Sequence, residues 1–167
     1  MALIIENGTG VSGAVSFVTV EEARAFAEFR GATLPATDPS VEVLLVKAGD
    51  YLLGLEHFFQ GYRSTGTQRL PFPRADVYLP GGYSVPLNHI PALLKEAQIQ
   101  LAIEGVSRDI RPTGDGREVI REKVGPLETE YTAGAGGTVQ PVFNKVWDLL
   151  LPLMKNQGGG RLGVVRA

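Results

Sequence analysis

Apolar residues recur every three or four positions in four stretches of the chain, the period of a helix with one buried face. The first stretch runs from Glu21 to about Arg30 and stops at Gly31. Thr19, just before it, and Glu22, in its first turn, have the spacing of a capping box. The second begins at Asp38-Pro39, a capping residue followed by a proline suited to a first helical turn. Its apolar positions are Val41, Leu44, Leu45, Ala48, Leu52, Leu55 and Phe59.

Two further helices are predicted later in the chain. One begins at Pro91, and its apolar face consists of Leu94, Ala97, Leu101 and Val106. The other begins near Pro141 and runs to about Asn156, with Pro152 expected to bend or end it. Its apolar face holds Val142, Val146, Leu149, Leu150 and Leu153, with Phe143 and Trp147 beside it. The residues expected to be buried include Leu44, Leu45, Leu52, Leu55, Leu94, Leu101 and Trp147.

Between the helical stretches lie two regions of different character. Residues 60–90 are rich in proline and glycine, which predicts one long ordered loop, and long loops usually serve a function. Residues 117–131 alternate as two strands around Gly125-Pro126, with apolar and charged side chains on both faces. Such a hairpin is expected to project or to meet another subunit. The candidate interface residues are Ile120, Val124, Leu127 and Tyr131.

The end of the sequence predicts an extended arm. Three consecutive glycines begin the segment 158–167, and glycine is a poor helix former. A short β-prone stretch follows, whose candidate docking residues are Arg161, Leu162, Val164, Val165 and Arg166. The predicted fold class is therefore mainly α: a bundle of about four helices with a projecting β-hairpin, a long Pro/Gly-rich loop and a C-terminal arm. We expect one domain over residues 1–157.

Composition removes several functional classes. The 167 residues carry a formal net charge of −2, which argues against nucleic-acid binding that depends mainly on phosphate neutralisation. The absence of cysteine excludes disulfides, thiolate metal sites and cysteine catalysis. Neither His57 nor His89 has a pair of acidic residues at the spacing of metal ligands, and no serine triad is evident. The sequence thus predicts no catalytic residue, no metal and no cofactor, and a chain that is not an enzyme.

Two motifs admit more than one interpretation. Glycines 8, 10 and 13 have the spacing of a dinucleotide-binding loop, but β-prone residues follow them instead of a helix, so we expect an ordinary turn. Residues 69–74 interleave arginine with apolar and aromatic residues, a pattern found where single strands bind by stacking. Alternatively, Leu70 and Phe72 anchor the loop on the helices while Arg74 pairs with carbonyl groups or acids. The acidic composition favours the second interpretation.

Four segments, taken together, show a family resemblance. Residues 14–26 resemble the opening of bacteriophage head–tail adaptor (connector) proteins, and Gln68–Arg74 is similar to their "QaLaWPR" loop, with Phe72 in place of tryptophan. Ile90–Leu101 and Glu122–Tyr131 resemble their third helix and their hairpin. The resemblance covers residues 13 to about 155 in the family's order. Some members are described as DnaT-like single-stranded-DNA-binding proteins.

The resemblance implies a structural virion protein of the phage neck. Such a protein would form a homo-oligomeric ring of about twelve copies that docks beneath the portal protein and extends the DNA channel. Its other partners would be a downstream neck or tail-completion protein and genomic DNA passing through during ejection. It would assemble in the host cytoplasm and reside at the head–tail junction of the virion. The alternative is a DnaT-like single-stranded-DNA-binding replication protein.

Overall fold

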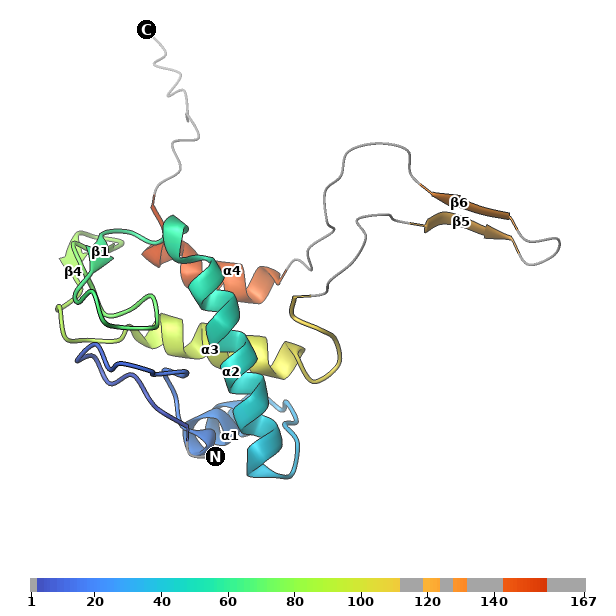
Figure 1. The fold of residues 1–167 in the computed structure, drawn as a ribbon, viewed down its shortest axis with the longest axis horizontal. Helices are drawn as coiled ribbons and strands as arrows, with labels where there is room; N and C mark the ends of the chain where they lie inside the picture. Colours follow the sequence, from blue (N-terminus) through green and yellow to red (C-terminus); the bar gives the residue numbers. More distant parts are fainter. Residues whose placement is uncertain (1–2, 112–118, 124–127, 132–142, 156–167) are drawn as a thin grey trace, which may run out of the picture.

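The computed structural model describes residues 3–111, 119–123, 128–131 and 143–155, and within them the fold is mainly α-helical with a β-hairpin (Figure 1). The helices are α1 (Val20–Phe29), α2 (Asp38–Gly54), α3 (Ala92–Glu104) and α4 (Asn144–Leu150). Single 3₁₀ turns follow α2 and α4: η1 (Glu56–Phe58) and η2 (Leu151–Leu153).

Short strands form antiparallel pairs in the remaining described segments. Residues 60–90, predicted as one loop, contain β1 (Tyr62–Arg63) with β2 (Arg74–Ala75) and β3 (Tyr78–Leu79) with β4 (Tyr83–Ser84). The predicted hairpin consists of β5 (Val119–Lys123) and β6 (Glu128–Tyr131), whose register shifts between Val119 and Arg121.

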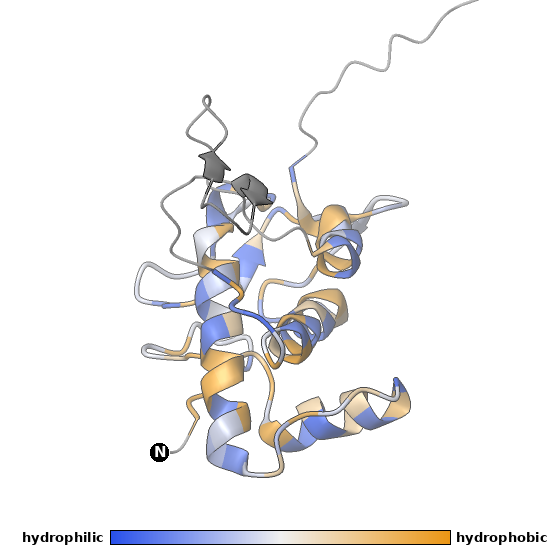
Figure 2. Ribbon diagram, turned by 90° about the vertical axis from the view of Figure 1, so that its right-hand side faces the viewer, coloured by the Kyte–Doolittle hydropathy of each residue, from blue (hydrophilic) through white to orange (hydrophobic). Residues whose placement is uncertain are grey.

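Helix α3 lies at the centre of the helical body and contacts α1, α2 and α4. In Figure 1, α2 crosses α3, while α4 and α1 lie on opposite sides of it. In Figure 2, hydrophobic and hydrophilic residues alternate along α1, whereas α3 is buried on most of its sides, because it contacts three other helices. The core between them includes side chains with no exposed surface, among them Leu45, Leu52, Leu94, Leu101 and Leu150.

A buried glutamine joins three segments of this core. Gln98 of α3 has no exposed surface, and its Oε1 accepts a hydrogen bond from the backbone N–H of Phe17 at 2.8 Å. Its Nε2 donates to Ser16 Oγ at 3.0 Å and to the carbonyl of Leu45 in α2 at 2.9 Å. Because a buried amide is costly without partners, these bonds hold the segment before α1 against α2 and α3.

The same contact requires a glycine in α2. A Cβ at Gly49 would lie 2.5 Å from the carbonyl oxygen of Val15, closer than van der Waals contact allows. Glycine in a helix interior costs about 1 kcal/mol relative to alanine. Its presence at this position lets the backbone before α1 lie directly on α2.

Backbone N–H groups of the glycine motif near the start of the chain bind the side chain of Glu6, which precedes the motif. The carboxylate of Glu6 is buried and accepts backbone N–H bonds from Gly8 at 2.9 Å, Gly10 at 2.9 Å and Val11 at 2.6 Å. Converging N–H groups of this kind also bind phosphates. The intramolecular carboxylate takes that place here, so the motif is a structural turn.

The helix starts follow the sequence pattern more closely than the helix ends do. The capping box is confirmed: Thr19 Oγ1 accepts from the N–H of Glu22, whose carboxylate accepts from the N–H of Thr19. Helix α2 ends at Gly54, before the predicted Phe59, and Leu55 is only partly buried. Helix α3 ends at Glu104, which leaves Val106 exposed.

The last helix is also shorter than predicted. Helix α4 ends at Leu150, and the chain continues as η2 around Pro152, which cannot donate a helical hydrogen bond. Trp147 is partly buried, because it lies beside the core. Pro141 and Val142 lie outside the described residues. None of the described helices has the length and apolar character needed to cross a membrane.

Replacing Gln98 should destabilise the fold measurably. Gln98→Leu leaves the buried N–H of Phe17 without its acceptor, which should lower the free energy of unfolding by about 2–4 kcal/mol. Urea titration of both proteins measures this difference. Gln100→Leu on the same helix is the control, because Gln100 bonds only Glu104 one turn away, and it should cost less than about 1 kcal/mol. Equal stability of the two variants would contradict the role assigned to Gln98 as the side chain that joins the segment before α1 to α2 and α3.

Candidate nucleic-acid interface

A buried arginine organises the backbone of residues 60–75. Arg74 is only 5% exposed, and its guanidinium donates to the carbonyls of Gln60 at 2.6 Å, Gly61 at 2.7 Å and Pro71 at 3.3 Å. Strands β1 and β2 have only two residues each, so strand pairing satisfies few of the carbonyls in this region. Arg74 supplies the missing donors and thereby holds the irregular chain in one conformation.

Glu56 balances the charge of Arg74 and of a second arginine. Both of its carboxylate oxygens accept from Arg63, from Nε and Nη2, and Oε1 also accepts from Arg74. Hydrogen bonding by Arg63 holds the pKa of Glu56 below its ordinary value, although partial burial acts in the opposite direction. The same bond raises the pKa of Arg63, whereas burial lowers that of Arg74. The three side chains form one ion-pair cluster.

Gln68 holds the chain between Arg63 and Arg74 in place. Its Oε1 accepts from the N–H of Thr65 at 3.0 Å, and its Nε2 donates to the carbonyls of Leu70 and Pro73, both at 3.0 Å. The peptide bond between Phe72 and Pro73 is cis. These bonds close residues 65–73 into a compact loop with a buried amide at its centre.

The stretch with interleaved arginines faces inward. Leu70 and Phe72 have no exposed surface, and the Phe72 ring packs edge-on against Phe59 with centroids 5.3 Å apart. Arg69 forms an ion pair with Asp50 of α2 at 2.7 Å. Since Phe72 and Arg74 are buried and Arg69 is paired with Asp50 at the surface, residues 69–74 do not themselves present an aromatic surface for stacking bases.

Three tyrosines on the neighbouring strands are instead exposed to solvent. Tyr62 of β1 is 62% exposed, Tyr78 of β3 is 51% exposed and Tyr83 of β4 is 73% exposed. Val77 and Val85 flank the second strand pair and are buried, and their N–H···O bond of 2.9 Å closes the hairpin base. Because side chains alternate along a strand, burying Val77 turns Tyr78 outward.

A groove of about 800 Å³ runs beside Tyr78. One wall belongs to the β3–β4 hairpin, and the opposite wall belongs to the segment around η2. Gln60 joins the walls: its Nε2 donates to the carbonyls of Tyr78 and Pro152, and its Oε1 accepts from the N–H of Tyr78. The side chains that line the groove include Asp76, Tyr78, Leu151, Pro152, Met154 and Lys155.

Glycine is required at the floor of this groove. Gly61 has a φ of +63°, and a Cβ there would lie 1.7 Å from the carbonyl oxygen of Ala75. A side chain would therefore separate β1 from the turn that follows β2. The close approach brings Asp76 beside the strands that carry the tyrosines.

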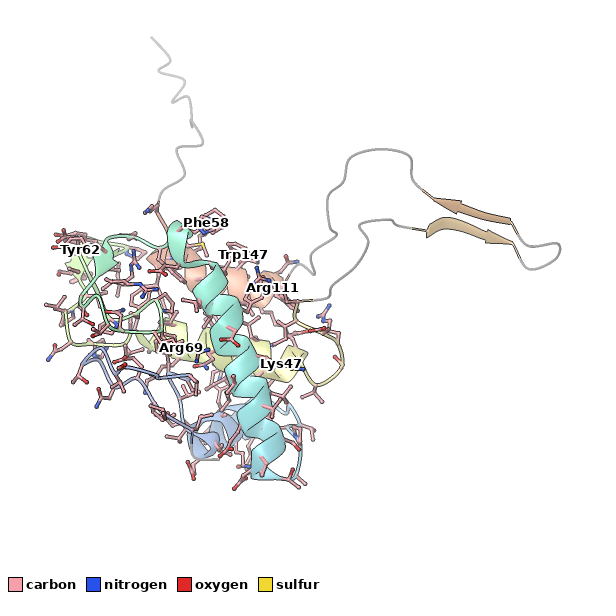
Figure 3. All side chains as sticks on the ribbon, in the orientation of Figure 1. Lys47, Phe58, Tyr62, Arg69, Arg111 and Trp147 are labelled. Carbon is pink, nitrogen blue, oxygen red and sulfur yellow. The ribbon has the colours of Figure 1, made fainter. Side chains whose placement is uncertain are left out.

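Most described cations are paired with acids, and a few are not. Lys47, Arg111, Lys145 and Lys155 form no ion pair with any carboxylate of the described residues. Arg111 lies against Gly54 of α2. Figure 3 shows Phe58, at the end of η1 just beyond α2, with Tyr62 on one side and Trp147 and Arg111 on the other. Lys47 lies farther along the same helix.

Two sets of predicted interface residues lie outside the part of the structure that describes side chains. These are the hairpin residues Ile120, Val124, Leu127 and Tyr131, and the arm residues Arg161, Leu162, Val164, Val165 and Arg166. Their proposed contacts stay predictions. Within the described residues, no group of three or more His, Asp or Glu side chains is arranged to hold a metal ion.

Comparison with protein families identifies one match. The whole chain, residues 1–167, matches the model of a family described as "Putative DnaT-like ssDNA binding protein". No curated protein and no solved structure matches the chain.

The family match corrects the main functional interpretation of the sequence. The interpretation of the chain as a structural neck protein that forms a ring beneath the portal is wrong. The alternative interpretation, a DnaT-like single-stranded-DNA-binding protein, agrees with the match. Of the predicted partners, the match supports DNA, and neither the ring nor the portal protein. The physical reason is visible in the shared motif: Gln68, Phe72 and Arg74 build the loop and the core, so their presence reports the fold rather than the use made of its surface.

Acidification should weaken the Glu56 cluster. The pKa of Glu56 is lowered in the folded protein, so the unfolded chain takes up a proton first as the pH falls. The stabilisation is therefore complete above the ordinary glutamate pKa of about 4.3 and is lost as the pH falls through the lower folded value. Urea titrations should show that the stability difference between wild type and Glu56→Gln is largest at neutral pH and shrinks below about pH 4. A constant difference would exclude charge-dependent stabilisation by Glu56.

Proposed function

We propose that this chain, which belongs to the DnaT-like single-stranded-DNA-binding protein family, binds single-stranded DNA by stacking unpaired bases on Tyr62, Tyr78 and Tyr83. The observation that carries the proposal is the exposure of all three rings on short strands held by buried polar contacts. Every base has a π face, so stacking of this kind tolerates any sequence. In a duplex both faces of each base are already stacked, and the tyrosines would have no access.

The phosphates of a bound strand would meet the unpaired cations. Lys155 lines the groove beside Tyr78, and its position is set by backbone bonds: its N–H donates to the carbonyl of Phe58 at 2.8 Å. Arg111 and Lys47 along α2 extend the cationic surface past Phe58. We infer a strand path from the tyrosines, past Lys155 and Phe58, to α2.

This arrangement reconciles DNA binding with a net charge of −2. Stacking on an exposed ring contributes about 1–3 kcal/mol per base and does not depend on salt in the way that phosphate contacts do. An acidic protein with three exposed tyrosine rings on these strands, and with most of its described cations paired with carboxylates, would rely mainly on the bases. The proposal involves no catalytic step, and the prediction that the chain is not an enzyme stays a prediction.

Removing the rings should abolish most of the binding. The triple variant Tyr62→Ala, Tyr78→Ala, Tyr83→Ala should bind an oligonucleotide of about eight nucleotides at least a hundredfold more weakly than wild type. Fluorescence anisotropy with a labelled strand measures the affinity. The rings are exposed, so thermal unfolding should be nearly unchanged.

The triple Tyr→Phe variant is the matched control. It keeps all three stacking faces and removes only the hydroxyl groups, so its affinity should stay within about threefold of wild type. Equal binding by the alanine variant and wild type would overturn the proposed surface. Failure of wild type to bind any single strand would overturn the proposed function itself.

Binding should depend only moderately on salt. Neutralising about three phosphates, by Lys155, Arg111 and Lys47, predicts that log K against log[salt] has a slope of about −2 for a single strand. Lys155→Ala should reduce the magnitude of that slope by about 0.7. A slope several times steeper, unchanged in the lysine variant, would place the phosphate contacts elsewhere.

A further inference from the structure

The groove beside Tyr78 contains a carboxylate whose placement is unusual for a surface that meets DNA. Asp76 has a φ of 56°, a left-handed conformation that few residues other than glycine, asparagine and aspartate adopt. Its side chain is exposed, and no described residue bonds or pairs with its carboxylate. It lines the same groove as Tyr78 and Lys155.

We infer that this groove binds a single nucleobase that bears an exocyclic amino group, with Asp76 as the residue that selects it. The inference rests on the proposed function. The groove has the size of small-ligand sites in proteins, at about 800 Å³. Its lining provides an aromatic face on Tyr78, an apolar face on Leu151 and Pro152, and a cation on Lys155.

Each part of a nucleotide has a counterpart in this lining. The ring of the base stacks on Tyr78, with the aliphatic side chains of η2 on the other wall of the groove. The ammonium group of Lys155 neutralises the adjoining phosphate. An aromatic side chain on one wall, aliphatic side chains on the opposite wall and a nearby cation together favour a nucleotide over a peptide as the occupant.

The carboxylate decides which base is preferred. A carboxylate only accepts hydrogen bonds, and the N4 amino group of cytosine donates them. Uracil presents a carbonyl oxygen at that position, and its N3–H lies between two carbonyl oxygens that a carboxylate repels. Cytosine is therefore preferred over uracil, although stacking on Tyr78 is similar for both.

The backbone at Asp76 makes a conservative test possible. Asparagine tolerates the same left-handed conformation, so Asp76→Asn should fold as wild type does. The new amide both accepts and donates, so it can pair with cytosine or with uracil. Asp148→Asn is the matched control, since it makes the same change of charge at an exposed position of α4 outside the groove lining.

The experiment compares oligo(dC) with oligo(dU) of about eight nucleotides at neutral pH by fluorescence anisotropy. Wild type and Asp148→Asn should bind oligo(dC) about tenfold more tightly than oligo(dU), whereas Asp76→Asn should bind the two within about twofold of each other. Affinity of Asp76→Asn for oligo(dU) should not fall. Equal affinities in wild type, or an unchanged preference in Asp76→Asn, would overturn this inference while leaving the proposed function intact. Absence of binding to both strands would overturn the proposed function as well.

Discussion

The guanidinium of Arg74 lies inside the protein and donates to three backbone carbonyls that the short strands around it leave without partners. Glu56 and Arg63 complete its surroundings, so the buried charge is both paired and hydrogen-bonded. Removing such a group would leave three backbone carbonyls without their donor, whereas Glu56 would keep its two bonds to Arg63. The order of residues 60–75, and with it the position of Tyr62, depends on this contact. Rings held in advance need no ordering when a ligand binds, which favours affinity.

The distribution of charge explains how an acidic protein could bind DNA. The arginines of the loop between Gln60 and Ala75 are occupied by carboxylates of this chain: Arg63 and Arg74 by Glu56, and Arg69 by Asp50. Arg74 is buried, whereas Arg63 and Arg69 are partly exposed but already paired with these carboxylates. The outer surface of residues 60–90 carries tyrosines instead. In the proposed binding mode, stacking and a few phosphate contacts share the binding energy, a balance consistent with sequence-tolerant binding of single strands.

The helices and their core followed from the sequence, whereas the exposed surface did not. Apolar periodicity and the capping box at Thr19 depend on neighbours a few residues away, so a pattern in the chain reveals them. Gln98 bonds Phe17, which lies 81 residues away in the sequence, and no local pattern indicates such a partner. The arginines of residues 69–74 suit stacking and internal pairing equally well in sequence. The tyrosines on either side of Pro80-Gly81-Gly82 were a usable signal, because that turn predicts a hairpin, but which strand face is buried depends on the packing of Val77 and Val85.

Photo-crosslinking with an oligonucleotide that carries halogenated uracil tests the central claim most directly, because the reaction marks side chains that stack on the base. Mass spectrometry of the digested adduct should locate the crosslinks on Tyr62, Tyr78 and Tyr83. Crosslinks confined to α1, or to the exposed side chains of α4, with none on the tyrosines, would contradict the proposed surface and the account built on it.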